Sequence, residues 1–285
     1  MGKIRMVLPK GRLIKKVVAL LNDAGLALEV NDRHYLPDVS DPHLSIKIMK
    51  PQNIAQLVEV GSHDVGFTGY DWIMETGADV VTLLDLQFDP VSIVAAVSES
   101  SGEASLRRRR IVVASEYQNL TLTFLNQAGY DNHYFIRTFG ATEVFPPDDA
   151  DMIVDNVSSG RTLRAHHLKI LKRILSSSTR FIANRGAMAD PSRRKKIEDW
   201  VTVFRGILDA RERVMLEMNV SRERLDELVR ACPCMRAPTV APLSGRAGYA
   251  VKIAVRREET KELIPRLKEM GASDILEYEL RKVVL

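Results

Sequence analysis

The 285-residue sequence predicts an α/β protein with a smaller C-terminal domain in which strands and helices follow a different order. Through the first two-thirds of the chain, short apolar runs alternate with helical patterns, and this alternation restarts after Arg110. A strand–loop–helix rhythm is typical of largely parallel sheets, because parallel strands need a crossover that is usually a helix. The last ~70 residues, enough for a small domain, lose this rhythm. A hydrophobic content of 45% supports real cores.

The first run of this rhythm begins at the N-terminus. Apolar residues with helical spacing follow the first strand, and Gly25 can end that helix. The elements expected here are, in order, a strand at Ile4–Leu8, a helix over Leu13–Leu21, a strand at Leu44–Ile48, a helix around Ile54–Val58, a strand at Asp64–Thr68 and a helix that opens at Gly69-Tyr70-Asp71.

The second run predicts a similar α/β lobe. Its expected elements are strands at Ile111–Ala114, Tyr134–Ile136, Met152–Val154 and Phe181–Ala183, a helix at Leu120–Leu125 and a long helix from about Leu163. We therefore expect a first lobe of residues 1–92 with 181–208 and a second lobe of residues 93–180, with Val91–Val97 near the crossing. Ligands of such sheets bind at the carboxyl ends of strands, in a cleft between lobes.

The C-terminal region, residues 212–285, predicts a ferredoxin-like domain. An amphipathic helix marked by apolar residues from Ile197 to Leu208 leads into it. Its expected elements are strands at Val214–Val220, Thr239–Ala241, Tyr249–Val255 and Leu276–Leu280, a helix at Arg222–Arg230 capped by Ser221, and a helix at Glu258–Met270 bent by Pro265. The order β-α-β-β-α-β is ferredoxin-like. This fold hosts many functions and names none.

Charge and hydropathy argue against two classes of partner, nucleic acids and membranes. The net charge is +4, and the densest basic run, Arg107–Arg110, has no interleaved aromatic residues. A nucleic-acid surface needs a broader basic stripe or stacking residues, so we interpret this run as a solvated connection. No apolar run reaches membrane-spanning length, and the N-terminus lacks the apolar core of a signal peptide. A cytoplasmic location without membrane partners is expected.

Protein side chains alone do not predict a metal site. The two cysteines, Cys232 and Cys234, flank Pro233 and have no histidine nearby, which is poor zinc spacing. His166 and His167 are adjacent, so on a helix they diverge. We expect reduced thiols and no metal cage built from protein alone.

The segment from Asp151 to Leu163 predicts a phosphate site. A buried strand ends at Asp155, and hydroxyl residues and a glycine precede a helix expected to begin near Thr162. Gly160 allows close approach of the backbone, helix N-terminal amides favour phosphate, and the carboxylate can accept bonds from ribose hydroxyls. The other candidate ligands are Ser158, Ser159, Arg161, Thr162 and Leu163. An ordinary helix cap is the structural alternative. A Walker loop is excluded, because no Gly-Lys-Ser/Thr is present.

Three further strand-to-helix turns carry candidate nucleotide or pyrophosphate ligands. Lys10, Gly11 and Arg12 put two cations at a helix start, which is unfavourable for the helix dipole unless an anion binds there. In the other two turns the candidates are Gly69 with Asp71, and Glu143. The alternative readings are surface charge for the cations and a helix cap for Asp71.

Four segments together resemble ATP phosphoribosyltransferase in its long form, the first enzyme of histidine biosynthesis. They are Lys10-Gly-Arg-Leu13, Gly66-Phe-Thr-Gly-Tyr-Asp71, Asp155-Asn-Val-Ser-Ser-Gly-Arg-Thr-Leu-Arg-Ala165 and Ala237-Pro-Thr-Val-Ala-Pro-Leu243. The match covers essentially the whole chain in order, and its most specific part is the phosphate loop. The resemblance implies periplasmic-binding-protein-like lobes, an ACT-like regulatory domain, Mg²⁺ dependence, a homohexamer and feedback inhibition by histidine.

The resemblance also implies roles for individual residues. The 5-phosphate of phosphoribosyl pyrophosphate lies on Ser158–Leu163, and Asp155, the catalytic candidate, holds the ribose hydroxyls. Lys10 and Arg12 meet pyrophosphate or the triphosphate of ATP. The effector candidates are Asn219, Thr239 and Ala272, and Asn219 stands where an acidic residue is expected.

Several first-lobe positions depart from the family pattern. Lys50 and Asn53 replace an arginine and an aspartate, Tyr70 replaces a lysine, and Gln87-Phe88-Asp89 replaces a glycine-flanked aromatic residue. In the second lobe, Thr142 also departs from the pattern and stands for a valine before Glu143. These departures leave open a non-catalytic ligand sensor on the same lobes as the alternative to the enzyme. A nucleic-acid-binding protein, suggested only by the basic charge, is a second rival.

Overall fold

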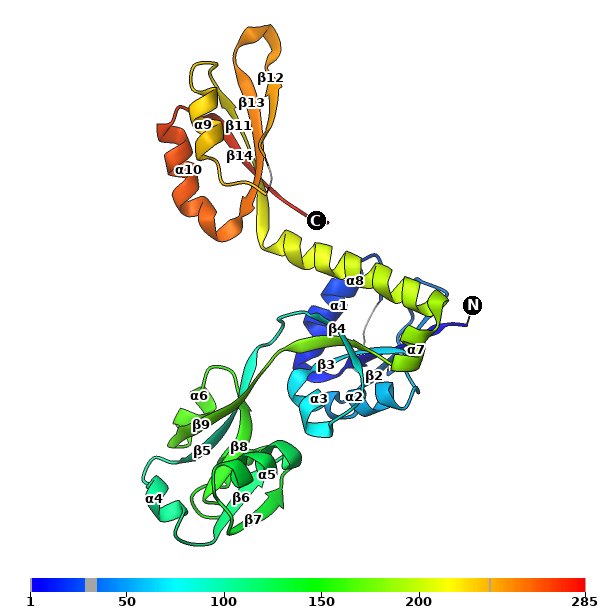
Figure 1. Cartoon of the computed structure of the whole chain (residues 1–285), viewed down its shortest axis with the longest axis vertical. Helices are drawn as coiled ribbons and strands as arrows, with labels where there is room; N and C mark the ends of the chain where they lie inside the picture. The colour runs from blue at the N-terminus through cyan, green and yellow to red at the C-terminus, as the bar shows by residue number, and fades with distance from the viewer. Residues whose placement is uncertain (1, 29–34, 236, 285) are drawn as a thin grey trace. The chain divides into compact units, whose positions relative to one another are not determined.

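The computed structural model describes residues 2–28, 35–235 and 237–284 (Figure 1). The chain forms two compact units, one of residues 1–22 and 26–197 and the other of residues 23–25 and 198–285. Two five-stranded sheets lie in the first unit and a four-stranded sheet in the second. None of the helices in the described ranges has the length and apolar character needed to span a membrane.

The first sheet follows the order β2-β1-β3-β10-β4. Its strands and helices are β1 (Ile4–Pro9), α1 (Ile14–Asp23), β2 (Leu44–Met49), α2 (Pro51–Glu59), β3 (Val65–Gly69), α3 (Tyr70–Thr76), β4 (Val81–Asp85) and β10 (Thr179–Ala183). Strands β1, β2 and β3 are parallel, whereas β10 is antiparallel to β3 and β4. The expected strands are confirmed, and so is the end of α1 at Gly25, whose φ is 86°. This sheet and its helices are the first lobe.

The second sheet, order β7-β6-β8-β5-β9, forms the second lobe. Its elements are β5 (Val91–Ser98), α4 (Glu103–Leu106), β6 (Ile111–Ser115), α5 (Gln118–Gln127), β7 (His133–Arg137), β8 (Met152–Val157), α6 (Arg161–Ala165) and β9 (Leu168–Ser177). Parallel β6, β7 and β8 give the predicted rhythm, while β5 is antiparallel to both β8 and β9.

The long helix expected from about Leu163 is wrong. Helix α6 has only five residues, and strand β9 takes the rest of that segment. Two register shifts in the β5–β9 pairing leave Leu171 and Ile174 without a direct partner. Each bulge reverses the inward–outward alternation, so the apolar residues that reach the core follow a helix-like spacing. The bulges therefore gave a strand the sequence pattern of a helix.

Two chain segments connect the lobes, and they hydrogen-bond to each other. One leads from β4 to β5 and the other from β9 to β10 (Figure 1). The Leu86 amide donates to the Thr179 carbonyl at 3.0 Å, and the Thr179 amide donates to the Phe88 carbonyl at 3.0 Å. The Ser178 hydroxyl adds a bond of 2.7 Å to Asp85 Oδ1. The connection is thus a paired ribbon.

Helix α3 of the first lobe also binds the N-terminus of α5 in the second. The Glu75 carboxylate, only 6% exposed, accepts the backbone amides of Asn119 and Leu120, each at 3.0 Å. The Asn119 side-chain amide also donates to the backbone carbonyl of Glu75 at 2.7 Å. Because the first amides of a helix lack partners inside it, Glu75 acts as a cap supplied by the other lobe.

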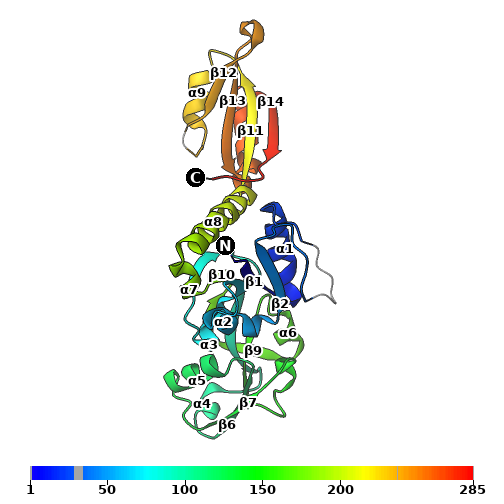
Figure 2. The ribbon, with the colours of Figure 1, turned by 90° about the vertical axis from the view of Figure 1, so that its right-hand side faces the viewer.

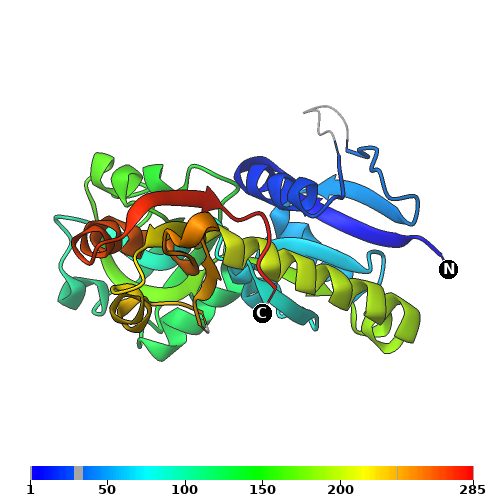
Figure 3. The same cartoon turned by 90° about the horizontal axis from the view of Figure 1, so that it is seen from above.

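The second unit confirms the ferredoxin-like prediction. The short helix α7 (Arg185–Ala189) and the long helix α8 (Pro191–Arg211), yellow-green in Figure 3, precede its first strand. Its elements are β11 (Arg213–Val220), α9 (Leu225–Ala231), β12 (Thr239–Pro242), β13 (Tyr249–Arg256), α10 (Thr260–Glu269) and β14 (Ser273–Glu279). The strands are antiparallel in the order β12-β13-β11-β14, as Figure 2 shows. The inward residues of β11 and β13 pack on both helices in one apolar core.

One detail of this unit was predicted wrongly. Ser221 does not cap a helix at Arg222, because α9 begins at Leu225 with Arg224 as its N-cap. The Arg224 amide instead donates to the Ser221 carbonyl at 3.3 Å, which closes a turn. A local side-chain bond between Ser221 and Glu223 belongs to that turn and lowers the pKa of Glu223.

We predict that Glu75→Ala lowers the free energy of unfolding by about 1–3 kcal/mol, because it leaves buried amides without acceptors. Urea unfolding at pH 7 measures this change. Met74→Ala is the control, since Met74 is exposed on the same helix. Equal stability of the two variants would contradict the capping role of Glu75.

Candidate functional site

The predicted phosphate loop lines a cavity of about 340 Å³. Strand β8 runs on to Val157, so Asp155 lies inside the strand and pairs with Val94 of β5, not at the strand tip as expected. The predicted residues that meet at this cavity are Arg12, Glu143, Asp155, Ser158, Ser159, Gly160, Arg161, Thr162 and Leu163. Residues far apart in the sequence therefore surround one space.

The loop's shape depends on Gly160 and Arg164. Gly160 has φ 71°, a left-handed conformation that favours glycine, and a Cβ there would lie 3.1 Å from the Arg164 guanidinium. The Arg164 side chain donates to the Ser159 carbonyl at 3.1 Å. Because α6 has only five residues, the donors that this loop can offer to an anion are the amides that open the helix and the nearby hydroxyls, not a long helix dipole.

Asp155 is a half-buried carboxylate with one occupied oxygen. Its Oδ1 accepts the Asn156 backbone amide at 2.6 Å and the Asn156 side-chain amide at 3.2 Å. Burial raises the pKa of Asp155 to about 6, the Asn156 amide opposes this rise, and the charges of Glu143 and Glu116 add to it. The carboxylate form dominates above that pH. Among the described residues, no donor hydrogen-bonds Oδ2, which is available to a ligand.

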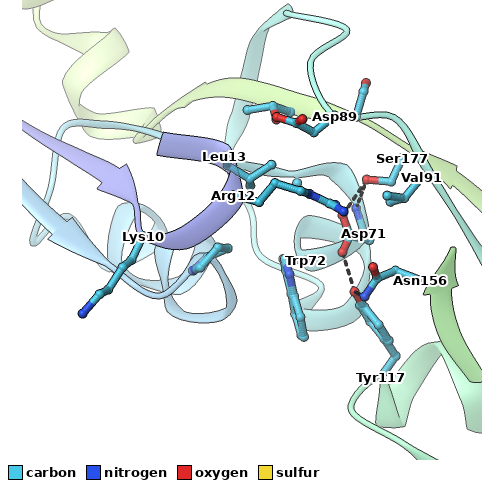
Figure 4. Close-up of a pocket in the computed structure, with 14 residues that line it drawn as sticks. Lys10, Arg12, Leu13, Asp71, Trp72, Asp89, Val91, Tyr117, Asn156 and Ser177 are labelled. Carbon is cyan, nitrogen blue, oxygen red and sulfur yellow. Dashed lines mark hydrogen bonds between the residues drawn. The ribbon is translucent and has the colours of Figure 1, made fainter. Parts of the chain in front are cut away.

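A second cavity, of about 240 Å³, shares Arg12 and Asn156 with the first. The predicted residues Lys10, Arg12, Gly69 and Asp71 line it (Figure 4). Gly11 is not part of the lining, but its φ of 84° turns the chain between Lys10 and Arg12. The two cavities thus adjoin through Arg12 and Asn156.

Asp71 is buried, and both of its carboxylate oxygens have donors from the second lobe. The Ser177 hydroxyl donates to Oδ1 at 2.5 Å, and the Tyr117 hydroxyl donates to Oδ2 at 2.8 Å. The carboxylate makes no capping bond within α3. A Cβ on Gly69 would lie 2.2 Å from Asp71 Oδ1, so this arrangement requires glycine at position 69. Asp71 connects the lobes and forms one wall of the cavity.

Lys10 and Arg12 differ in orientation. Figure 4 shows Lys10 pointing away from Asp71 and Ser177. The Lys10 ammonium donates to the Tyr35 hydroxyl at 2.8 Å, which lowers the pKa of Tyr35. Arg12 lines both cavities. Arg12 is therefore the better-placed cation for an anionic ligand.

The first-lobe departures occupy three places, and one of them, Asp89, also lines the second cavity. Lys50 and Asn53 line a third cavity, of about 280 Å³, which shares Trp72 with the second and also includes Arg137 and Phe139. Tyr70 stacks under the Arg180 guanidinium at 5.0 Å, and Asp89 pairs with Lys16 at 3.0 Å. These two substitutions therefore have partners within the first lobe.

The effector candidates do not converge within one chain. Asn219 on β11 donates to Asp274 at 2.9 Å and pairs with Ser273, next to the buried Ala272. Thr239 lies on the edge strand β12, and both β13 and β11 separate it from β14. Any site containing all three candidates needs a ligand that spans the sheet or a second copy.

Metal ligation by protein alone has no support in the described ranges. No group of three or more His, Cys, Asp or Glu side chains there could hold a metal ion. Both cysteines are free thiols, and burial raises the pKa of Cys232 to about 11, which keeps it protonated.

Sequence reasoning missed several site residues. Tyr117, Ser177, Trp72 and Asn156 line the second cavity, and Arg164 braces the loop. Ser177 is separated from Asp71 by 106 positions, so no local pattern connects them. Asn156 and Arg164 stand inside the quoted phosphate motif, where a count of side-chain donors could have found them.

Known proteins resemble this chain over almost its whole length. The family model for ATP phosphoribosyltransferase matches residues 50–206, and the model described as HisG, C-terminal domain, matches residues 210–282. Proteins named ATP phosphoribosyltransferase from Pelotomaculum thermopropionicum and Desulforudis audaxviator are 38% and 40% identical, with 99% of both chains covered in each case. An ATP phosphoribosyl transferase (HisG:HisZ) complex from Thermotoga maritima shares the fold, with TM-score 0.65 and 22% identity over 72% of this chain and 98% of that one.

Proposed function

Because the chain belongs to the ATP phosphoribosyltransferase family, it is a transferase of histidine biosynthesis, and we propose that the cavity beside Asp155 holds the phosphoribosyl group. The reaction moves the 5-phosphoribosyl group from phosphoribosyl pyrophosphate to N1 of ATP and releases pyrophosphate. One observation supports the proposal most strongly. The loop residues 158–163, a carboxylate with an available oxygen and Arg12 surround a single cavity of about 340 Å³.

The proposed roles follow the charge that the reaction develops. The bond between ribose C1 and the pyrophosphate oxygen breaks with its electron pair on oxygen, while adenine N1 forms the new bond to C1. Positive charge spreads over the ribose, and the Asp155 carboxylate stabilises that charge. Its Oδ2 also accepts a hydrogen bond from a ribose hydroxyl. The amides and hydroxyls of Ser158–Leu163 hold the 5-phosphate. Arg12 faces the departing pyrophosphate, and positioning of two anionic substrates supplies much of the remaining rate.

We propose that Mg²⁺ enters with the substrate phosphates. Asp155 and Glu143 line one cavity. Burial raises the pKa of Asp155 and the charge of Glu143 adds to this rise, so a cation bound near these carboxylates would relieve their repulsion. Mg²⁺ commonly binds one or two carboxylates together with phosphates and waters, which fits this donor set. When bound, it neutralises charge on the leaving pyrophosphate. We also propose a homohexamer and a cytoplasmic location, both on the family resemblance.

The test of the activity follows two products at once. Incubation with ATP, phosphoribosyl pyrophosphate and Mg²⁺ should yield pyrophosphate and the N1-ribosylated adenine chromophore in equal amounts, and omission of either substrate should abolish both. Binding of both substrates without pyrophosphate release would support the non-catalytic sensor instead.

We predict that Asp155→Asn lowers kcat/KM at least ~100-fold, equivalent to ~2.7 kcal/mol of transition-state stabilisation, because the size remains while the charge is lost. The melting temperature should change little. Asp148→Asn, an exposed residue, is the control. Near-native activity of Asp155→Asn would remove this carboxylate from the mechanism, whereas unfolding would favour a purely structural role.

A second prediction concerns the two cations of the first turn. Replacing Lys10 and Arg12 together with alanine should raise the KM for an anionic substrate with little loss of stability, because exposed cations at a helix start add little without an anion. Most of the effect should come from Arg12→Ala, because Arg12 lines both cavities. Lys15→Ala in α1 is the matched control. If the double variant has wild-type kinetics, both residues are only surface charges.

The C-terminal unit generates a third prediction. We propose that it binds histidine between neighbouring subunits, near Asn219, Thr239 and Ala272. Titration calorimetry with millimolar histidine should show binding, and the same concentrations should inhibit pyrophosphate release. Asn219→Asp should tighten binding, because a carboxylate attracts the effector's ammonium group better than an amide. An absence of both heat and inhibition would refute this site.

A further inference from the structure

A chain of hydrogen bonds joins the buried Asp71 to Asp155. Tyr117 donates to Asp71 Oδ2 at 2.8 Å, and the Asn156 side-chain amide donates to the Tyr117 hydroxyl oxygen at 3.3 Å (Figure 4). The same Asn156 amide lies 3.2 Å from Asp155 Oδ1, which also accepts the Asn156 backbone amide at 2.6 Å. Asn156 therefore lies between the two carboxylates.

The chemistry of the groups fixes the direction of these bonds. An ionised carboxylate only accepts, so the single hydroxyl proton of Tyr117 goes to Asp71. Its lone pair then faces Asn156, which must present its NH₂ group to that oxygen. The second hydrogen of this NH₂ group is available to Asp155. With the opposite amide orientation, the Asn156 oxygen would face two acceptors and no donor.

We propose that Asn156 is a positioning residue, which Tyr117 and Asp71 hold in one orientation so that it fixes the Asp155 carboxylate with Oδ2 directed to the ligand. The inference deepens the proposed function and rests on the role of Asp155 in it. Tyr117 is held firmly in place, because the residue is only 1% exposed and its ring stacks on Trp72 with centroids 4.5 Å apart.

The charges around Asp155 explain why such a residue is needed. Burial and the carboxylates of Glu143 and Glu116 favour its neutral form, and the backbone amide of Asn156 favours the ionised form. The Asn156 side-chain amide, 3.2 Å from Oδ1, adds a second donor to the same oxygen. The cations that line the same cavity are Arg12 and Arg161. Both are exposed, so water screens their effect. Asn156 thus supplies the hydrogen bonds that the described structure gives to this carboxylate.

The test uses two substitutions that each remove a hydrogen bond of this chain and keep the approximate size of the side chain. Asn156→Leu keeps the approximate size and loses both side-chain donor hydrogens, while Tyr117→Phe keeps the buried ring and loses only the hydroxyl. Asn126→Ala is the control, since Asn126 is an exposed asparagine on α5. Two profiles are measured against pH: kcat/KM, and the affinity for ribose 5-phosphate by calorimetry, which requires no turnover.

The wild-type profiles should fall as the pH drops through about 6, where Asp155 becomes protonated. Asn156→Leu keeps the backbone amide that donates to Asp155 and loses the side-chain donors. Because loss of a donor to a carboxylate raises its pKa, this variant should move the acid limb towards higher pH, by up to about one unit. Tyr117→Phe should move it less and in the same direction. The double variant should match Asn156→Leu, because Tyr117 acts through Asn156. Asn126→Ala should titrate as the wild type.

The outcomes separate the inference from the proposed function. If Asp155→Asn is inactive while Asn156→Leu titrates as the wild type, the positioning role is wrong and the function stands. Fully additive shifts from Asn156→Leu and Tyr117→Phe would also overturn it, since they would mean that Tyr117 acts independently. If Asp155→Asn retains activity, the role of Asp155 itself is wrong. Should Asn156→Leu fail to fold, an unshifted limb in Tyr117→Phe would refute the anchor.

Discussion

Two buried carboxylates on helix α3 hold the lobes of the first unit in register. Asp71 binds Tyr117 and Ser177, and Glu75 binds the first amides of α5. A buried carboxylate is costly unless its oxygens have donors, and here every donor comes from the second lobe. Separation of the lobes would leave four carboxylate oxygens without these partners. This constraint fixes the walls of the cleft.

The cleft that results is a row of adjoining cavities. The phosphate-loop cavity shares Arg12 and Asn156 with the cavity beside Asp71, and that cavity shares Trp72 with the one beside Lys50. Two large anionic substrates need such a row, because their reacting atoms must meet while their phosphates stay apart. The family departures Lys50 and Asn53 lie in the cavity farthest along this row from the phosphate loop, which itself matches the family motif.

The sequence predicted the elements whose patterns are local. Clean alternation at Tyr249–Val255 identified β13, and the apolar strand followed by Ser158–Leu163 predicted a phosphate loop, which in the structure lines a cavity. Strand β9 was missed because two bulges changed the alternation of its side chains. The partners of Asp71 were missed because they depend on how distant segments meet. Local patterns thus predicted the ligand loop, and only the fold revealed what holds it.

A crystal structure with bound phosphoribosyl pyrophosphate tests the central claim most directly, namely that the cavity beside Asp155 holds the phosphoribosyl group. The account predicts the 5-phosphate on the amides and hydroxyls of Ser158–Leu163, with a ribose hydroxyl within hydrogen-bond distance of Asp155 Oδ2. A 5-phosphate in the cavity beside Asp71 or Lys50, with the loop at 158–163 empty, would contradict it.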